Sequence, residues 1–145
     1  MKKIFYLLFF VTICLLCVDC ERGDEDFNLK ISGEHEKHGY VDLGLSVKWA
    51  TCNIGAINPE EYGYYFAWGE VEPKEVYDWS TYRYGLDWNQ VIKYCDNDYC
   101  GKDGFVDDKM ELDSEDDAAT MNWGGDWRMP TNVEMDELKT QCSWT

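Results

Sequence analysis

The sequence predicts one folded domain that combines short strands with at least one helix, set behind an N-terminal export segment. Three observations predict it: a charge-free apolar run near the N-terminus, alternating apolar residues over 41–49, and a helix start near the C-terminus. The 145 residues suit a single ordinary domain and are too few for two. The formal charge of −16 argues against nucleic acid and anionic membrane surfaces as partners, since both require a basic face.

Residues 1–19 have the features of a secretory signal. Two lysines precede the uncharged run 4–18, which is shorter than the roughly 20 residues that a membrane-spanning helix needs. A single membrane anchor is the alternative interpretation of this run. Removal of 1–19 takes away two lysines and one aspartate, so the formal charge of the remaining chain is −17.

The remaining chain is poor in aliphatic residues but keeps all 7 Trp. So few aliphatic residues with so much charge would normally indicate disorder. Aromatic side chains bury large areas each, however, and can replace aliphatic ones in a core. The composition therefore predicts a folded domain with an aromatic core.

Residues 20–38 are predicted to be an acidic tether, and the domain is predicted to span 39–145. Within the tether, the His-x-x-His spacing of His35 and His38 is interpreted as two solvated histidines, since no further metal ligand stands nearby. The alternation over 41–49 predicts a half-buried strand with a bend at Gly44.

The aromatic run 64–68 predicts a second, buried strand. Residues 70–104 show no sustained periodicity, and so long an irregular stretch is either functional or wrongly assigned. A final helix is predicted to start at Thr131, because Thr131 and Glu134 have the spacing of a capping box. One apolar stripe follows on this helix, formed by Met135, Leu138 and Cys142.

A cysteine, Cys20, directly follows the apolar run and precedes the acidic stretch 21–26. This arrangement resembles a bacterial lipoprotein signal, which implies that Cys20 is the lipidated first residue of the mature protein. The acidic stretch resembles the export signal of surface-exposed lipoproteins in Gram-negative bacteria. Residues 17–19 depart from the family preference for leucine and small residues, so lipidation at Cys17 and ordinary cleavage near Cys20 are alternatives.

Five segments follow one another in a recognisable order: VDLGLSVKWATCNIGA, EYGYYFAWGE, YDWSTY, LDSEDDAA and NWGGDWRMPT. They resemble the Fibrobacter succinogenes major paralogous domain family, which occurs in secreted and surface proteins of bacteria. The resemblance implies an α+β domain of the C-type-lectin-like fold, with short strands, one or two helices and long loops. In that family a further segment with strands follows the last motif, so 39–145 is expected to be the N-terminal part of such a domain, truncated and incomplete at its C-terminus.

Aromatic residues and neighbouring aspartates are candidates for a sugar-binding site, because flat rings stack on sugars and carboxylates accept hydroxyl hydrogen bonds. The alternative is that most of these rings form the aromatic core. The candidates are Trp68, Trp79, Tyr82, Tyr84, Trp88, Asp78 and Asp87.

Calcium is the one candidate cofactor. Residues 96–107 partly match a calcium-binding loop, with oxygen ligands at the first and third positions and glycine at the sixth. The alternatives are a hydrated acidic loop and, for the acidic run 107–117, a solvated acidic surface. The candidate ligands are Asp96, Asp98, Asp103 and Asp107.

Four cysteines remain if Cys20 carries lipid, and an exported protein can form disulfides from them. The preferred pairing is Cys95–Cys100 with Cys52–Cys142, and the alternatives are reduced thiols or a zinc site. A reactive thiol is disfavoured, because the predicted domain contains no histidine to act as its base.

The function predicted from the sequence is a lipoprotein anchored in the outer membrane and exposed on the cell surface. Its domain is expected to bind an extracellular glycan or protein, and no catalytic residue is assigned. One alternative is a modifying enzyme related to the formylglycine-generating enzymes, whose catalytic cysteines lie in a later part of their fold. The other is a fragment without independent function.

Overall fold

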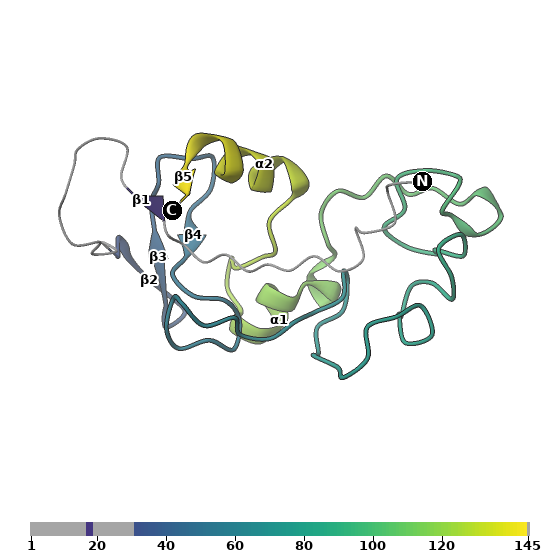
Figure 1. Cartoon of the computed structure of the whole chain (residues 1–145), viewed down its shortest axis with the longest axis horizontal. Helices are drawn as coiled ribbons and strands as arrows, with labels where there is room; N and C mark the ends of the chain where they lie inside the picture. Colours follow the sequence, from purple (N-terminus) through teal and green to yellow (C-terminus); the bar gives the residue numbers. More distant parts are fainter. Residues whose placement is uncertain (1–16, 19–30, 145) are drawn as a thin grey trace. The chain divides into compact units, whose positions relative to one another are not determined.

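The computed structural model describes residues 17–18 and 31–144 and divides into two compact units (Figure 1). We call residues 65–129 the aromatic unit, and residues 17–18, 31–64 and 130–144 the sheet unit. The predicted lipid site at Cys20 and most of the predicted signal lie outside the described residues. Within the described part, no helix has the length and apolar character needed to cross a membrane.

The sheet unit contains a three-stranded antiparallel sheet in the order β2-β3-β4. Its strands are β2 (Gly33–His35), β3 (His38–Val41) and β4 (Trp49–Ala50). The sheet begins at Gly33, inside the stretch predicted to be a tether, so the folded part starts before residue 39. A second sheet pairs β1 (Cys17–Val18) with β5 (Ser143–Trp144), and removal of 1–19 would remove β1. This sheet content, with two helices, confirms a small α+β fold.

The single strand predicted over 41–49 is wrong, because this segment is a β-hairpin. Val41 at the end of β3 pairs with Trp49 at the start of β4. The chain reverses at Gly44, which has a φ of 73°, and its N–H donates to the Asp42 carboxylate at 3.1 Å. The alternation of apolar residues therefore continues across the turn and hides the reversal.

The strand predicted over 64–68 is also wrong, since this run forms no strand pairing. Its backbone groups form hydrogen bonds of turns instead. The N–H of Tyr64 donates to the carbonyl of Ile54 at 2.7 Å, and the N–H of Glu70 donates to the carbonyl of Ala67 at 2.9 Å. Tyr64 and Tyr65 are exposed, and Ala67 is buried. A short aromatic run without alternation does not distinguish a strand from a packed loop.

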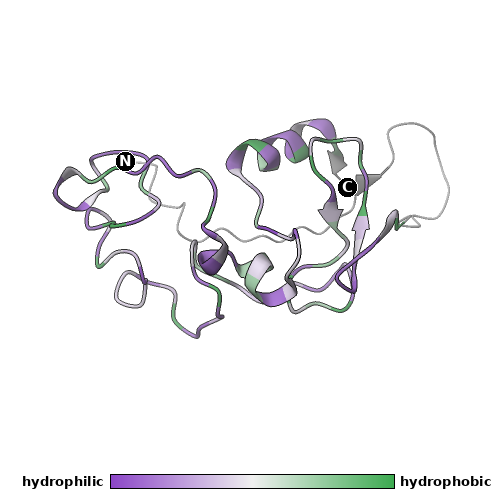
Figure 2. Ribbon diagram, turned by 180° about the vertical axis from the view of Figure 1, so that it is seen from behind, coloured by the Kyte–Doolittle hydropathy of each residue, from purple (hydrophilic) through white to green (hydrophobic). Residues whose placement is uncertain are grey.

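The final helix, α2 (Asn132–Gln141), confirms the predicted start and stripe. The N–H of Glu134 donates to the Thr131 hydroxyl, and the N–H of Thr131 donates back to the Glu134 carboxylate at 2.8 Å, which completes the capping box. Leu138 is fully buried against Val41 and Trp49, and Met135 and Cys142 pack around it. Figure 2 shows that hydrophilic residues cover much of the rest of α2. The helix thus closes the core of the sheet unit.

The aromatic unit is built mainly from loops around an aromatic core, as the composition predicts. Its short helices are η1 (Lys102–Gly104), η2 (Ser114–Asp116) and α1 (Ala118–Trp123). Tyr82 and Tyr84 are buried with Ala67, and their rings meet edge to face at 6.1 Å. Trp79 and Tyr94 extend this stack at 5.8 and 5.6 Å. Such edge-to-face pairs add to the stabilisation that area burial alone provides.

Replacement of Leu138 by alanine tests the role of α2. The change should lower the free energy of unfolding by about 3 kcal/mol, because it leaves a cavity in the core of the sheet unit. The matched control on the same helix is Val133→Ala, which should change it by less than about 0.5 kcal/mol because Val133 is 70% exposed. Urea denaturation measures both, and equal effects of the two changes would contradict this packing.

Candidate functional site

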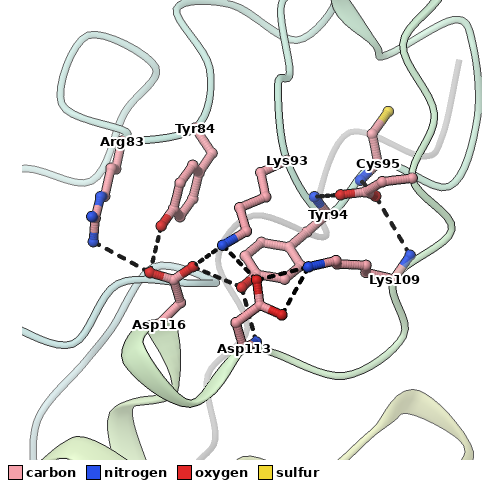
Figure 3. Close-up of polar contacts among 9 residues, drawn as sticks. Arg83, Tyr84, Lys93, Tyr94, Cys95, Lys109, Asp113 and Asp116 are labelled. Carbon is pink, nitrogen blue, oxygen red and sulfur yellow. Dashed lines mark hydrogen bonds and ion pairs between the residues drawn. The ribbon is translucent and has the colours of Figure 1, made fainter.

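The best-defined polar cluster of the described chain surrounds the carboxylate of Asp116, in the aromatic unit (Figure 3). Asp116 is 1% exposed and ends η2. Its Oδ1 accepts the hydroxyl of Tyr84 at 2.5 Å, and its Oδ2 accepts the hydroxyl of Tyr94 at 2.8 Å. Lys93 Nζ lies 2.5 Å from Oδ2, and Arg83 Nη1 lies 3.4 Å from Oδ1. Four donors therefore satisfy one buried carboxylate.

A second carboxylate, Asp113, extends the cluster toward solvent. Lys93 Nζ lies 2.7 Å from Asp113 and so bridges it to Asp116. Lys109 Nζ lies 2.7 Å from the same Asp113 oxygen. The N–H of Asp113 donates to the Tyr94 hydroxyl at 3.0 Å. The Tyr94 hydroxyl thus accepts a hydrogen bond from Asp113, the residue before η2, and donates one to Asp116, the last residue of η2.

The charges of the cluster are mutually stabilised. Burial alone would raise the pKa of Asp116, but hydrogen bonds from Lys93, Tyr84 and Tyr94 lower this pKa to about 2. Burial and the Asp116 hydrogen bond raise the pKa of Tyr84 to about 12. Hydrogen bonds to Asp113 and Asp116 raise the pKa of Lys93 above its ordinary value. At neutral pH the cluster therefore holds charged Lys93 and ionised Asp116 beside neutral tyrosines.

Asp107 makes a second connection within the same unit. Its carboxylate accepts the N–H groups of Tyr94 and Cys95, each at 2.8 Å. Tyr94 has a φ of 59°, a left-handed conformation that these bonds help to hold. The Cys95 thiol donates to the Asn97 carbonyl at 3.0 Å. Burial raises the pKa of Cys95, so the thiol form, which is a poor nucleophile, prevails at neutral pH.

The cluster is suited to holding segments together. Every oxygen of Asp116 already accepts a hydrogen bond, and its pKa lies far below the value that a general acid or base needs near neutral pH. Its donors come from residues 83–84 and 93–94, which are more than twenty positions away in the chain. The cluster therefore fixes the loops that begin and end at these positions.

The acidic run 107–117 was predicted to be a solvated surface or a source of calcium ligands, and the first interpretation is wrong at its end. Asp116 and Asp117 are both buried. Asp117 caps α1, accepting the N–H groups of Thr120 at 2.9 Å and Met129 at 2.8 Å. Sequence reasoning missed both roles. The one local signal for the burial of Asp116 and Asp117 is the pair of small apolar residues that follows them, Ala118 and Ala119, which are both buried.

The candidate sugar-binding residues separate into core and surface. Tyr82 is 6% exposed, its hydroxyl donates to the Trp68 carbonyl at 3.1 Å, and Trp79 packs against its ring. Tyr84 lies in the same core, so these rings support the fold. Trp88 is 47% exposed and is the candidate ring with the most accessible surface.

The two candidate aspartates mainly bond to their own turns. Asp78 accepts the N–H and the hydroxyl of Ser80, at 2.9 and 2.6 Å, and these bonds lower its pKa. Asp87 accepts the N–H of Trp88 at 2.7 Å. Each aspartate therefore bonds within its own turn, and a sugar-binding site at Asp78, Asp87 and Trp88 stays a prediction.

The candidate calcium ligands do not converge. No three carboxylate, thiolate or imidazole side chains of residues 31–144 gather into a metal-binding group. Asp107 instead binds two backbone N–H groups, and Asp96, Asp98 and Asp103 are exposed. Asp103 lies in η1 with a φ of 54°. A calcium site at these residues stays a prediction.

The four cysteines of the predicted domain, 39–145, are free thiols in the structure. Cys95 is buried, and Cys52, Cys100 and Cys142 are half-buried. Cys52 lies next to the Ile57 carbonyl, at 3.5 Å, and Cys142 packs on the core of the sheet unit. Their predicted pairing in an oxidising compartment stays a prediction.

Six of the exposed large apolar side chains lie in the segment 86–106, which also contains Lys93 and Tyr94, two partners of Asp116. We call this set the loop surface, and each member is at least 38% exposed. It consists of Leu86, Trp88, Ile92, Tyr99, Phe105 and Val106. Apolar side chains exposed on neighbouring loops make this segment a candidate interaction site.

Comparison of the chain with protein families, curated proteins and solved structures gives no match.

Replacement of Asp116 by asparagine tests the cluster. The pKa of Asp116 is about 2 in the folded protein and 3.8 without its partners, so the ionised form stabilises the fold above pH 4. This stabilisation, about 2 kcal/mol, is lost as the pH falls toward 2. Asp116→Asn should therefore lower stability at pH 6 and reduce its loss between pH 4 and 2, as measured by urea denaturation.

The control for this change is Asp136→Asn, which alters an exposed aspartate of α2. It should leave both the stability and its pH dependence close to those of the unaltered protein. A pH dependence that Asp116→Asn leaves unchanged would show that the cluster does not stabilise the fold.

Proposed function

We propose that this chain is a lipid-anchored protein of the bacterial outer surface whose folded part binds an extracellular partner, either a glycan or a protein. The loop surface carries the proposal, because it presents aromatic and aliphatic side chains on loops fixed by an aromatic core and a buried charge cluster. A fixed surface loses less conformational freedom on binding than a mobile one.

The hydrogen bonding of the Asp116 carboxylate and the burial of the Cys95 thiol favour a binding function over a catalytic one. The Asp116 carboxylate is fully hydrogen-bonded, and the Cys95 thiol is buried with a raised pKa. Neither group meets the requirements of a general base or an activated nucleophile. The modifying-enzyme alternative therefore gains no support from the described residues.

The C-type-lectin-like fold is part of the same proposal. The short antiparallel sheet, the two helices and the long loops of the aromatic unit agree with this fold class at a coarse level. Binding by long loops that a small scaffold positions is common, because loops tolerate variation while the scaffold keeps their ends fixed.

Lipidation at Cys20 can be tested by labelling. Expressed in a Gram-negative host fed with radiolabelled palmitate, the unaltered chain should incorporate label and fractionate with the outer membrane. Cys20→Ser should lose both, because the acceptor thiol is gone. The matched control is Cys17→Ser, which keeps that acceptor. Label that survives Cys20→Ser but not Cys17→Ser would place the anchor at Cys17. Absence of label from the unaltered chain would contradict the lipid anchor.

Binding is tested on a glycan array and by capture of surface proteins. If glycan is the partner, Trp88→Ala should weaken array binding by about tenfold, because an aromatic platform is lost. Tyr62→Ala is the matched control, since Tyr62 is an aromatic residue of the sheet unit that is 63% exposed. A chain that binds neither glycans nor proteins would contradict the proposed function.

A further inference from the structure

We infer that the loop surface is a docking site for a polypeptide segment that carries basic and aliphatic side chains. This inference rests on the proposed binding function and identifies the class of partner. It is carried by the geometry of the loops, the kind of side chains that they expose, and the charge around them.

The loops of this surface leave from one small ladder of backbone bonds. Val91 is its centre: it bridges Gly85 in antiparallel fashion and Gly101 in parallel fashion. The N–H of Val91 donates to the carbonyl of Cys100 at 3.0 Å, and the N–H of Lys102 donates to the carbonyl of Val91 at 2.8 Å. The loops 86–90, 93–99 and 103–106 therefore begin or end within a few residues of this ladder.

The ladder is fixed to the core on its inner side. Val91 itself is buried, and the N–H of Ile92 donates to the carbonyl of Tyr84 at 2.8 Å. The Tyr84 hydroxyl donates to the Asp116 carboxylate. Lys93 and Tyr94, which directly follow Ile92, donate to the same carboxylate. Hydrogen bonds thus tie the loops that carry the exposed side chains to the core of the aromatic unit.

Close packing shapes the last loop of the surface. A side chain at Gly101 would meet the Phe105 carbonyl oxygen at 1.7 Å, so the turn over η1 returns the chain tightly onto the ladder. This return places the exposed residues Phe105 and Val106 near the ladder strand that contains Gly101.

The exposed side chains favour a polypeptide over a sugar. Leu86 is 80% exposed and Ile92 is 51% exposed. Aliphatic groups of this kind offer no flat face for a sugar ring, but they bury well against the aliphatic side chains of a peptide. Aromatic members of the same surface, such as Trp88, are typical anchors in protein interfaces.

The charge of the surrounding loops specifies a basic partner. Between residues 85 and 108 there are six aspartates and two lysines. One of the lysines, Lys93, is bound inward by Asp113 and Asp116. The other lysine, Lys102, is exposed, and so are five of the six aspartates, among them Asp98 and Asp103. The exposed charge of these loops is therefore net negative, which attracts cationic segments and repels acidic ones.

The inference is tested with the full chain in detergent and fluorescently labelled 16-residue peptides, read by fluorescence polarisation. A peptide of lysine and leucine should bind, whereas a peptide of glutamate and leucine and a peptide of lysine alone should bind at least about tenfold more weakly. Binding of the first peptide should weaken between about 0.1 and 1 M salt, where the screening length falls from about 10 to 3 Å.

Variants place the peptide on the loop surface. The double change Leu86→Ser and Ile92→Ser should raise the Kd by about tenfold or more, since two exposed aliphatic contacts are lost. The matched control, Tyr62→Ser with Val133→Ser, alters two residues of the sheet unit that are 63% and 70% exposed and should leave the Kd unchanged. Asp98→Asn with Asp103→Asn should raise the Kd about threefold and reduce its salt dependence.

The inference is overturned if the double change at Leu86 and Ile92 leaves peptide binding unchanged, or if the glutamate–leucine peptide binds equally well. Glycan binding that depends on Trp88, without peptide binding, would overturn the inference and keep the proposed binding function. Failure of the chain to bind peptides, glycans and surface proteins would overturn both.

Discussion

The burial of one carboxylate, Asp116, organises the aromatic unit. An ionised carboxylate is costly to bury unless it is paired and hydrogen-bonded, and here two tyrosine hydroxyls and a lysine meet that requirement. Because the donors come from residues 84, 93 and 94, satisfying the charge also fixes the loops between them. Removal of one partner would leave the others facing an unbalanced charge, so the cluster acts as a unit.

This arrangement explains how a chain with so few aliphatic residues maintains long loops in a defined conformation. The rings of Tyr82, Tyr84 and Tyr94 provide apolar area, while two of their hydroxyls reach the Asp116 carboxylate. A phenylalanine core would provide the area but not the donors. Acidity and aromatic content are therefore linked in this cluster, while other acidic residues, such as Asp98 and Asp103, are exposed.

Local patterns in the sequence predicted the elements that local interactions determine. The capping box of α2 joins Thr131 and Glu134 within one turn of helix, so its spacing alone revealed it. The hairpin was missed because Leu43, Leu45 and Val47, in the loop between β3 and β4, also pack on the core and so continue the apolar alternation through the reversal. The Asp116 cluster was missed because its partners are 22 to 33 positions away, and no spacing rule connects residues at such separations. The aromatic core was predicted from composition, but not which rings form it.

The most direct test of this account is hydrogen exchange of backbone amides in Asp116→Asn, measured by NMR under native conditions. If the carboxylate fixes the loops, the amides of Val91, Ile92 and Lys102 should exchange at least about tenfold faster than in the unaltered protein, while those of α2 keep their rates. Equal rates in both proteins at the three ladder amides would show that the loops hold their conformation without the buried charge, and would contradict the central claim.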